Sequence, residues 1–415
     1  MARLSRALLA FAWLVATVSV PCAAFGRAFN VGFAAAIALA LTAACCNRRT
    51  LWSALPTRAL LAAFGLAVLA YAVPSLAQGL SARAFVSAGR GCAVFAWFIL
   101  MVLALGDPRA KRALVLAGAA LLVGNLLFAG CSLLIPGHFS SFERVRHEYV
   151  AGFPRFRGFA NSPAPAGVWA LVSIGLMESS PRSRDRWFAR ALGQLEAAAT
   201  LSIALLALPG LLAALLPRRW LRRTLVGASV VLAAAILYFQ PLELTVAGRA
   251  LTLSRELPEY WSEGLGPQYM PQVTIALPGI IVRGHVSAYG KLALRGLSCF
   301  AQHPLLGVGP GGFRDSCRVM AMNTFGEWTD QRDSHNQIGG LLAELGLVGV
   351  ALLTLAWLAL RRGYQFDAMT SWQRAVWTGL FICALGSEDL LSLPVLALLA
   401  SQLVPRTVAP SSLVP

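Results

Sequence analysis

The stretch DSHNQIGGLLAELGLVGVALLTLAWLALRR, residues 333–362, opens with polar residues and continues as an apolar run that ends in two arginines. An apolar run of about twenty residues is long enough to cross a bilayer as a helix. We expect Asp333 or Ser334 to cap this helix, which places His335 in its first turn. Glu344 lies in the apolar part, on the helix face opposite His335.

The rest of the chain repeats this pattern. Of 415 residues, 57% are hydrophobic and 13% are charged, whereas soluble proteins are about half apolar and about a quarter charged. The composition excludes a soluble fold and predicts an all-α, polytopic integral membrane protein with about twelve transmembrane helices. The apolar runs are 7–24, 30–46, 59–78, 84–105, 113–135, 166–178, 187–207, 209–217, 224–240, 335–360, 372–386 and 390–404.

The basic loops of this layout all fall on the side of the two termini. They are residues 47–49, 107–112, 181–186, 217–223 and 361–362. Cytoplasmic loops are enriched in Lys and Arg, so this side is expected to be the cytoplasm. Membrane orientation thus accounts for the net charge of +17, and no nucleic-acid partner is expected. Residues 187–217 are short for two spans, and we expect Pro209 and Gly210 to break them into a half-length pair.

Three regions follow from this layout. Residues 1–240 form helices one to nine with a short outer loop at 136–165, and residues 335–415 form helices ten to twelve with the C-terminal tail. Residues 241–334 form an extramembrane lobe. Within the lobe, apolar residues recur at helical spacing between 286 and 300, which predicts an amphipathic helix. The prolines and glycines of 303–313 end that helix.

Arginines gather on the expected outer side, against the orientation rule. Arg144, Arg146, Arg155 and Arg157 lie within fourteen residues of the loop 136–165. Guanidinium groups bind phosphate in bidentate fashion, so this cluster favours a phosphate site; the alternative is a solvated surface.

Two more arginines lie on the fourth predicted helix. Arg83 and Arg90 are seven residues apart and project from nearly the same face. Arg90 would lie within the hydrocarbon region, where a charge normally faces a bundle interior or a wet cavity. Arg83 could instead extend its side chain to the membrane interface.

His335 has the position of a general base. The positive end of a helix dipole disfavours imidazolium, and a neutral imidazole can accept a proton near pH 7. The alternative is an interfacial polar residue without a catalytic role. Glu344 is expected to pair with a buried arginine or to cap a broken helix. No cluster with metal-ligand spacing occurs on the outer side, so neither a metal nor a cofactor is expected.

Three segments together resemble the O-antigen ligase and polymerase superfamily of bacterial inner-membrane proteins. They are RFRGFANSP (155–163), HPLLGVGPGGF (303–313) and SHNQIGGLLAELGLVG (334–349). Their order, with the long outer loop between the first two, also matches the family. The resemblance implies glycan transfer from undecaprenyl diphosphate on the periplasmic face. In the ligase branch, the acceptor is a sugar hydroxyl of the lipid A–core oligosaccharide.

The resemblance also implies residue roles. The essential histidine of the family matches His335, and the arginine before its amphipathic periplasmic helix best matches Arg283, with Arg255 and Arg295 left open. A Ser-Arg-Gly of the family is replaced here by Leu208-Pro209-Gly210, so another arginine would supply that charge. The residues expected to bind the diphosphate are Arg155, Arg157, Arg83, Arg90 and Arg146, and those expected to support the site are Asn336, Asp333 and Glu344.

The resulting expectation is a metal-independent, inverting O-antigen ligase of the bacterial inner membrane. Its partners are an undecaprenyl-diphosphate-linked O-antigen donor, a lipid A–core acceptor and membrane lipids. Three alternatives stay open: an O-antigen polymerase, a protein O-oligosaccharyltransferase, and a flippase for lipid-linked glycans.

The lobe contains two cysteines, Cys299 and Cys317. The turn at 303–313 reverses the chain between them, and the periplasm is oxidising, so we expect them to approach and form a disulfide. The alternative is that both are free and packed.

Overall fold

The computed structural model describes most of the chain outside its N-terminal part and several loops. The described residues are 12, 21–24, 27–30, 36, 38, 42, 57–77, 79, 82–105, 108–134, 149–150, 153–154, 156–160, 163–200, 202–216, 218–246, 249–253, 272–277, 280–286, 288–317, 320–322, 328–330, 336–386 and 391–405.

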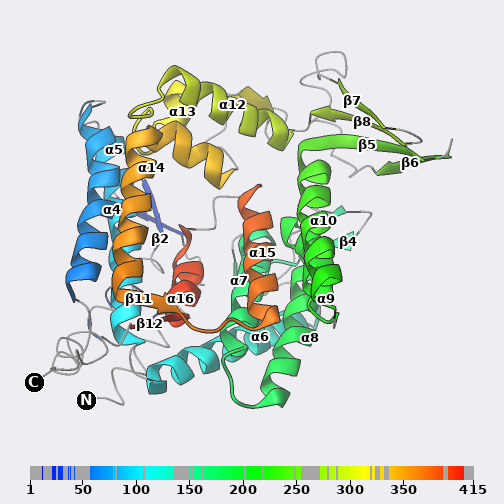
Figure 1. Ribbon diagram of the computed structural model, residues 1–415, viewed down its shortest axis with the longest axis horizontal. Helices are drawn as coiled ribbons and strands as arrows, with labels where there is room; N and C mark the ends of the chain where they lie inside the picture. The colour runs from blue at the N-terminus through cyan, green and yellow to red at the C-terminus, as the bar shows by residue number, and fades with distance from the viewer. Residues whose placement is uncertain are drawn as a thin grey trace, which may run out of the picture.

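Five helices within these residues are long and apolar enough to cross a membrane (Figure 1). They are α4 (Thr57–Ala77), α5 (Ala82–Ala104), α6 (Pro108–Leu134), α10 (Arg219–Tyr238) and α14 (Gln337–Gly363). Each coincides with a predicted apolar run, which confirms a mostly helical fold with candidate membrane spans. The runs 7–24 and 30–46 fall largely outside the described residues, so the number of about twelve spans stays a prediction.

Other helical segments of the bundle are shorter than a full membrane span. They are α7 (Pro163–Met177), α8 (Ser183–Ala199), the 3-10 helix η2 (Ile203–Ala207), α9 (Leu208–Ala213), α15 (Ser371–Ala384) and α16 (Leu393–Ser401). The predicted break at Pro209 was wrong. The chain breaks between Thr200 and Ser202, whose hydroxyl accepts a hydrogen bond from the Ala204 N–H. Pro209 lies in the first turn of α9, where its missing N–H would have no helical partner anyway.

The prediction of an all-α fold was wrong for the start of the lobe, which is an antiparallel four-stranded sheet of order β6-β5-β8-β7. Its strands are β5 (Phe239–Val246), β6 (Arg249–Leu253), β7 (Gln272–Leu277) and β8 (Ile280–Val286). Short two-stranded pairs occur elsewhere: β1 (Pro21–Ala24) with β2 (Arg27–Asn30), β3 (Tyr149–Val150) with β4 (Phe153–Pro154), β9 (Met320–Met322) with β10 (Trp328–Asp330), and β11 (Tyr364–Phe366) with β12 (Leu403–Pro405).

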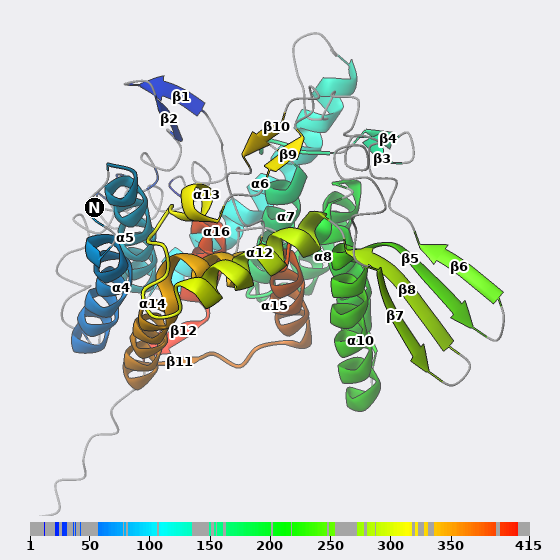
Figure 2. The same ribbon diagram turned by 90° about the horizontal axis from the view of Figure 1, so that it is seen from above.

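The amphipathic helix of the lobe is confirmed as α12 (Ala288–Gln302), followed by the short α13 (Phe313–Ser316). The helix begins later than its apolar pattern, because Val286 belongs to β8. Seen from above, α12 runs across the bundle from α10 towards α14, and the sheet extends outward beyond α10 (Figure 2).

The helices pack closely, both around large buried side chains and at glycines. Trp97 on α5 is fully buried, and its indole N–H donates to the Leu393 carbonyl at the start of α16 over 3.0 Å. Where α7 meets α8, a Cβ on Gly193 would lie 2.5 Å from the Ile174 side chain. Glycine therefore sets the approach of these two helices.

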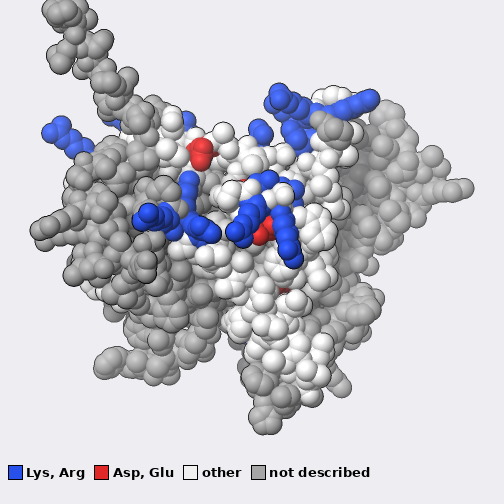
Figure 3. All heavy atoms as spheres, turned by 90° about the horizontal axis from the view of Figure 1, so that it is seen from below, with Lys and Arg blue, Asp and Glu red and all other residues white. Residues whose placement is uncertain are grey.

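The bundle has two distinct ends. The starts of α6, α8, α10 and α15 and the end of α14 lie at one end, here called the basic face, and Lys and Arg gather there (Figures 1 and 3). The basic loops 107–112, 181–186, 217–223 and 361–362 belong to these helix ends. The opposite end, here called the motif face, carries α12, the first part of α14 and the ends of α10 and α15 (Figure 1).

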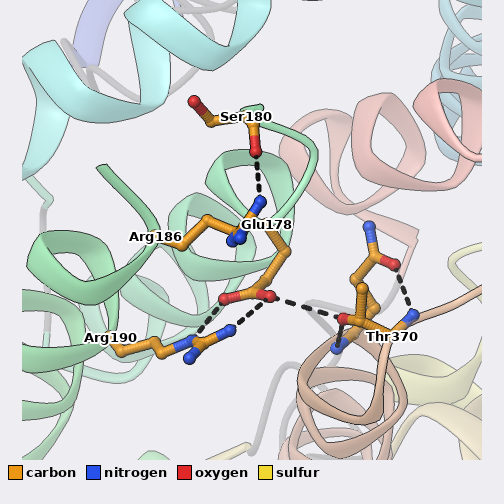
Figure 4. Close-up of polar contacts among 6 residues, drawn as sticks. Glu178, Ser180, Arg186, Arg190 and Thr370 are labelled. Atoms are coloured by element: carbon orange, nitrogen blue, oxygen red, sulfur yellow. Dashed lines mark hydrogen bonds and ion pairs between the residues drawn. The ribbon is translucent and has the colours of Figure 1, made fainter. Parts of the chain in front are cut away.

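An ion pair between Arg190 and Glu178 links three helices at the basic face (Figure 4). The guanidinium of Arg190 on α8 donates to both carboxylate oxygens of Glu178, over 2.6 and 2.8 Å, and lies 4.6 Å from the centre of the Trp372 ring. The side chain of Glu178 is fully buried. Thr370, the N-cap of α15, donates to the same carboxylate over 3.4 Å. This pair joins the end of α7 to the middle of α8 and the start of α15.

Candidate functional site

The helix α14 is broken where the loop 303–313 docks against it. Gly346 has φ 61° and ψ −170°, which interrupts the helix after Leu345. The first part lies across the motif face and the second part descends beside α4 (Figure 1). The predicted apolar run 335–360 therefore contains a break at Gly346, and the descending helix starts after it.

Backbone hydrogen bonds from the loop satisfy the groups that the break frees. The Val308 N–H donates to the Ala343 carbonyl over 2.9 Å, and the Leu347 N–H donates to the Pro304 carbonyl over 2.8 Å. Val348 donates to Leu305 in the same way, over 2.9 Å. Freed backbone groups within a membrane protein need such partners. The motifs HPLLGVGPGGF and SHNQIGGLLAELGLVG thus form one structural unit.

Two glycines make this close approach possible. A Cβ on Gly346 would lie 2.5 Å from the Gly307 nitrogen and the Leu305 oxygen, and a Cβ on Gly307 would lie 2.5 Å from the Glu344 backbone. Both glycines also have positive φ, at 61° and 64°. Any side chain at either position would be strained and would push the loop away from the helix.

Asn336 is the N-cap of α14, so the expectation that Asp333 or Ser334 caps this helix was wrong. Its side-chain oxygen accepts from the Gly339 N–H over 2.7 Å. Its amide nitrogen donates to the Tyr238 hydroxyl over 2.6 Å and to the Leu385 carbonyl over 3.1 Å. This buried amide joins the start of α14 to the ends of α10 and α15. His335 and Asp333 lie outside the described residues, and His335 directly precedes the cap rather than standing in the first turn.

Glu344 lies before the break, at the motif face, and not deep in the descending span. It is half-buried. The Tyr71 ring packs against Gly91, where a Cβ would lie 2.5 Å from it. The expectation of a buried partner arginine is not met by Arg90, whose side chain is exposed.

The arginine–glycine motif is held by a different cluster. The side-chain oxygen of Asn125 on α6 accepts from the Phe159 N–H over 3.2 Å, and its amide donates to Glu196 of α8 over 3.1 Å. The Phe156 N–H donates to the Ala199 carbonyl over 2.9 Å. Gly158 has φ 53° and stands directly against Asn125. These contacts fix the loop 156–160, and Arg157 within it is half-buried.

Glu196 is the most deeply buried acid of this cluster. It is 5% exposed, and its Oε1 has no hydrogen-bond partner among the described residues. It belongs to α8, which is not among the five candidate spans. Burial raises the pKa of its carboxyl to about 8, and the Asn125 hydrogen bond offsets this only in part. The carboxyl is therefore mostly protonated at neutral pH.

The disulfide between Cys299 and Cys317 is confirmed, with 5.6 Å between the Cα atoms. Both cysteines are buried in a small core with Val308, Phe313 and Ala343. The bond ties the end of α12 to the residue after α13, and the turn 303–313 lies between them. Because Ala343 belongs to α14, this core anchors the lobe on the helix that carries Asn336.

Arg295 of α12 contacts the segment that follows the turn 303–313. It is half-buried, and its Nε donates to the Cys317 carbonyl over 3.3 Å. On the same helix, a Cβ on Gly296 would lie 3.2 Å from the Gly339 backbone, so α12 rests on the first turn of α14 at this glycine. Arg295 therefore braces the disulfide segment.

The structure describes the positions of only some of the other arginines that were expected in the site. Arg83 stands in the first turn of α5, and Arg283 is on β8, opposite Glu243 of β5 and Thr274 of β7 in the register. Arg146, Arg155 and Arg255 lie outside the described residues. Arg157 and Asn336 belong to two clusters held by different helices.

Sequence reasoning missed Asn125, Glu196, Tyr71 and Tyr238. The signal for Asn125 was present, because an amide in the middle of an apolar helix is costly unless it has partners. The two tyrosines gave no signal, since tyrosine is common at membrane boundaries. In the described part of the chain, no three His, Cys, Asp or Glu side chains are grouped to hold a metal ion.

Comparison with known proteins adds no relative. No family model, no curated protein and no solved structure matches this chain.

Proposed function

We propose that this chain is an O-antigen ligase, which transfers a glycan from undecaprenyl diphosphate to a sugar hydroxyl of the lipid A–core oligosaccharide. The observation that carries the proposal is the docking of HPLLGVGPGGF into the break of the helix that begins SHNQIGG. These are two of the three segments on which the resemblance rests, and their backbone hydrogen bonds and facing glycines make them one unit.

Two independent signals support an orientation with the motif face in the periplasm. A disulfide forms and persists in an oxidising compartment, and Cys299–Cys317 lies at the motif face. The opposite face carries the basic helix ends, which suits the cytoplasmic side of a bacterial inner membrane.

In the proposed reaction, His335 accepts the proton of the acceptor hydroxyl while the oxygen of that hydroxyl attacks the anomeric carbon of the donor. The bond from that carbon to the diphosphate oxygen breaks, and undecaprenyl diphosphate leaves with the electron pair. A single displacement inverts the anomeric configuration. Asn336 supports this role, because its hydrogen bonds fix the start of α14 directly after His335 in the chain.

Arginines would stabilise the charge of the leaving diphosphate. Arg90 supports this part, since it is an exposed cation on an apolar helix and directly precedes Gly91, against which the Tyr71 ring packs. Arg157, in its anchored loop, is the second described candidate, and Arg155, Arg83, Arg146 and Arg283 complete the proposed set. Removing one well-placed donor of this kind costs about 10²–10³ in rate.

Reconstitution tests the proposal. Purified chain in lipid nanodiscs is mixed with an undecaprenyl-diphosphate glycan and lipid A–core, and products are separated by size. Ligase activity gives a ladder on lipid A–core, and EDTA leaves its rate unchanged. Extension of the donor without lipid A–core would identify a polymerase instead, and transfer to an added Ser/Thr peptide a protein transferase. Movement of labelled donor across vesicles without any covalent product would identify a flippase.

A further inference from the structure

A second charged site lies at the basic face, far from the motifs. A cavity of about 530 Å³ opens between the starts of α10 and α15. The residues that line it are Ala214, Arg219, Arg222, Arg223, Val226, Ser371, Arg374, Ala375 and Thr378. Arg219 and Tyr238 stand at the two ends of α10, roughly 28 Å apart at 1.5 Å rise per residue, so this cavity is separate from the Asn336 network.

The arginines of this cavity have no acidic partner among the described residues, and no carboxylate lines the cavity. Two other cations of the same face do have one: Arg190 pairs with Glu178, and the Lys111 Nζ lies 3.8 Å from an Asp367 carboxylate oxygen. The positive-inside rule alone explains why cations lie at this end of the helices. It does not explain why four arginines line one cavity.

The spacing of the cluster is costly without an anion. Arg219, Arg222 and Arg223 stand at i, i+3 and i+4 on α10, so their side chains share one face and repel one another. Arg374 adds a fourth positive charge from α15. A bound phosphate would turn this repulsion into attraction, and guanidinium groups match phosphate oxygens in bidentate fashion.

Two further features favour an anion. Ser371 is the first residue of α15, so the positive end of that helix dipole points toward the cavity. The hydroxyl of Thr378 lines the same space, although it already donates to the Arg374 carbonyl. The chemistry of the lining is therefore that of a phosphate-binding site.

The rest of the lining shows what else the ligand carries. Ala214, Val226 and Ala375 are apolar, and α10 is one of the five candidate spans, so the cavity lies at a membrane boundary. Trp220, beside the cluster, is 64% exposed, and tryptophan favours the headgroup level of a bilayer. A ligand with an anionic phosphate next to an apolar body fits both parts.

We propose that this cavity binds the phosphate headgroup of an anionic glycerophospholipid in the leaflet at the basic face. Arg222 and Arg374, one from each helix, close on the phosphate from two sides, and the three apolar residues contact the glycerol and the first acyl carbons. The lipid then holds the starts of α10 and α15 together. This site is independent of the proposed glycan transfer.

Native mass spectrometry of the full chain tests the proposal. The protein is extracted from nanodiscs of phosphatidylcholine with phosphatidylglycerol, and retained phosphatidylglycerol is counted per chain. The variant Arg222→Gln with Arg374→Gln should retain less by about tenfold or more, since each charged hydrogen bond lost is worth about that factor. The matched control Arg182→Gln with Arg184→Gln removes the same charge from exposed positions of α8 on this face, and should retain wild-type amounts.

Equal losses in both variants would mean general surface attraction and would overturn the proposal, as would no loss in either. A second arm uses the wild-type chain alone and does not depend on how the variants fold. Phosphatidylglycerol should raise its melting temperature over phosphatidylcholine, and inorganic pyrophosphate should not. Stabilisation by pyrophosphate without any by the lipid would identify a soluble polyphosphate ligand and contradict the lipid assignment.

Discussion

Replacing Gly346 by alanine should undo the docking of the loop 303–313 on α14. The residue has φ 61° and ψ −170°, a region that is essentially restricted to glycine and costs other residues about 1–3 kcal/mol. The added Cβ would also lie 2.5 Å from the Gly307 nitrogen and the Leu305 oxygen, and forcing such a shift in packed structure costs about 1–3 kcal/mol more. The free energy of unfolding should therefore fall by about 2–6 kcal/mol.

Scanning fluorimetry of the purified protein in detergent measures this loss. At about 2 °C per kcal/mol for a large domain, the apparent melting temperature should fall by roughly 4–12 °C. The matched control is Gly65→Ala in α4, where nothing lies within 4 Å of the new Cβ. In an open helix position, alanine is better than glycine by about 0.8–1.0 kcal/mol, so this variant should melt slightly higher.

The two substitutions are chemically identical, and their effects should have opposite signs. If Gly346→Ala melts at or above the wild-type temperature, the loop is not held in the break of α14, and the unit formed by the two motifs does not exist.

Three further predictions concern other parts of the fold. Replacing both Cys299 and Cys317 by serine should destabilise the lobe by about 3 kcal/mol, for a sequence separation of 18, and alkylation of the non-reduced wild-type protein should label neither cysteine. Arg190→Ala should cost about 3–5 kcal/mol in thermal or chemical unfolding because it leaves a buried carboxylate unpaired, whereas Lys111→Ala, at a partly exposed pair, should cost less than about 1 kcal/mol. Burial raises the folded-state pKa of Glu196 to about 8. The contribution of this carboxyl to stability is therefore full at low pH and is lost as the pH rises from 4.5 to 8. Glu196→Gln should flatten the dependence of the melting temperature on pH over that window, and an unchanged dependence would contradict the assignment.

The spans were predictable because long apolar runs leave few alternatives. The runs 59–78, 84–105 and 113–135 match α4, α5 and α6 within a few residues at most ends. The break in α14 was not predictable in the same way. Several glycines lie between 339 and 349, and the one that adopts positive φ is decided by a loop thirty or more residues earlier in the chain.

The sheet of the lobe was missed although its sequence carried a signal. VTIALPGIIV, residues 273–282, is two apolar runs rich in β-branched residues around a Pro-Gly pair, which is a hairpin pattern. The apolar spacing between residues 286 and 300 was recognised as a helix, but the strand pattern before it was not. The disulfide was predictable because its two cysteines alone lie in the lobe, and the turn between them reverses the chain.

The polar residues of the candidate site were predictable by type but not by partner. Asn336 was expected to support the site, and its role as the N-cap is a local property. Its bonds to Tyr238 and Leu385 join positions that are far apart in the sequence. Arg295 shows the same limit, because its acceptor, the Cys317 carbonyl, comes from beyond the turn.

The rate of glycan transfer by His335→Ala, measured in nanodiscs with the undecaprenyl-diphosphate donor and lipid A–core, tests the central claim most directly. General base catalysis is worth about 10²–10⁴-fold, so the variant should transfer at under about a hundredth of the wild-type rate while its melting temperature stays unchanged. Transfer above about a tenth of the wild-type rate, from folded protein, would show that His335 is not the base.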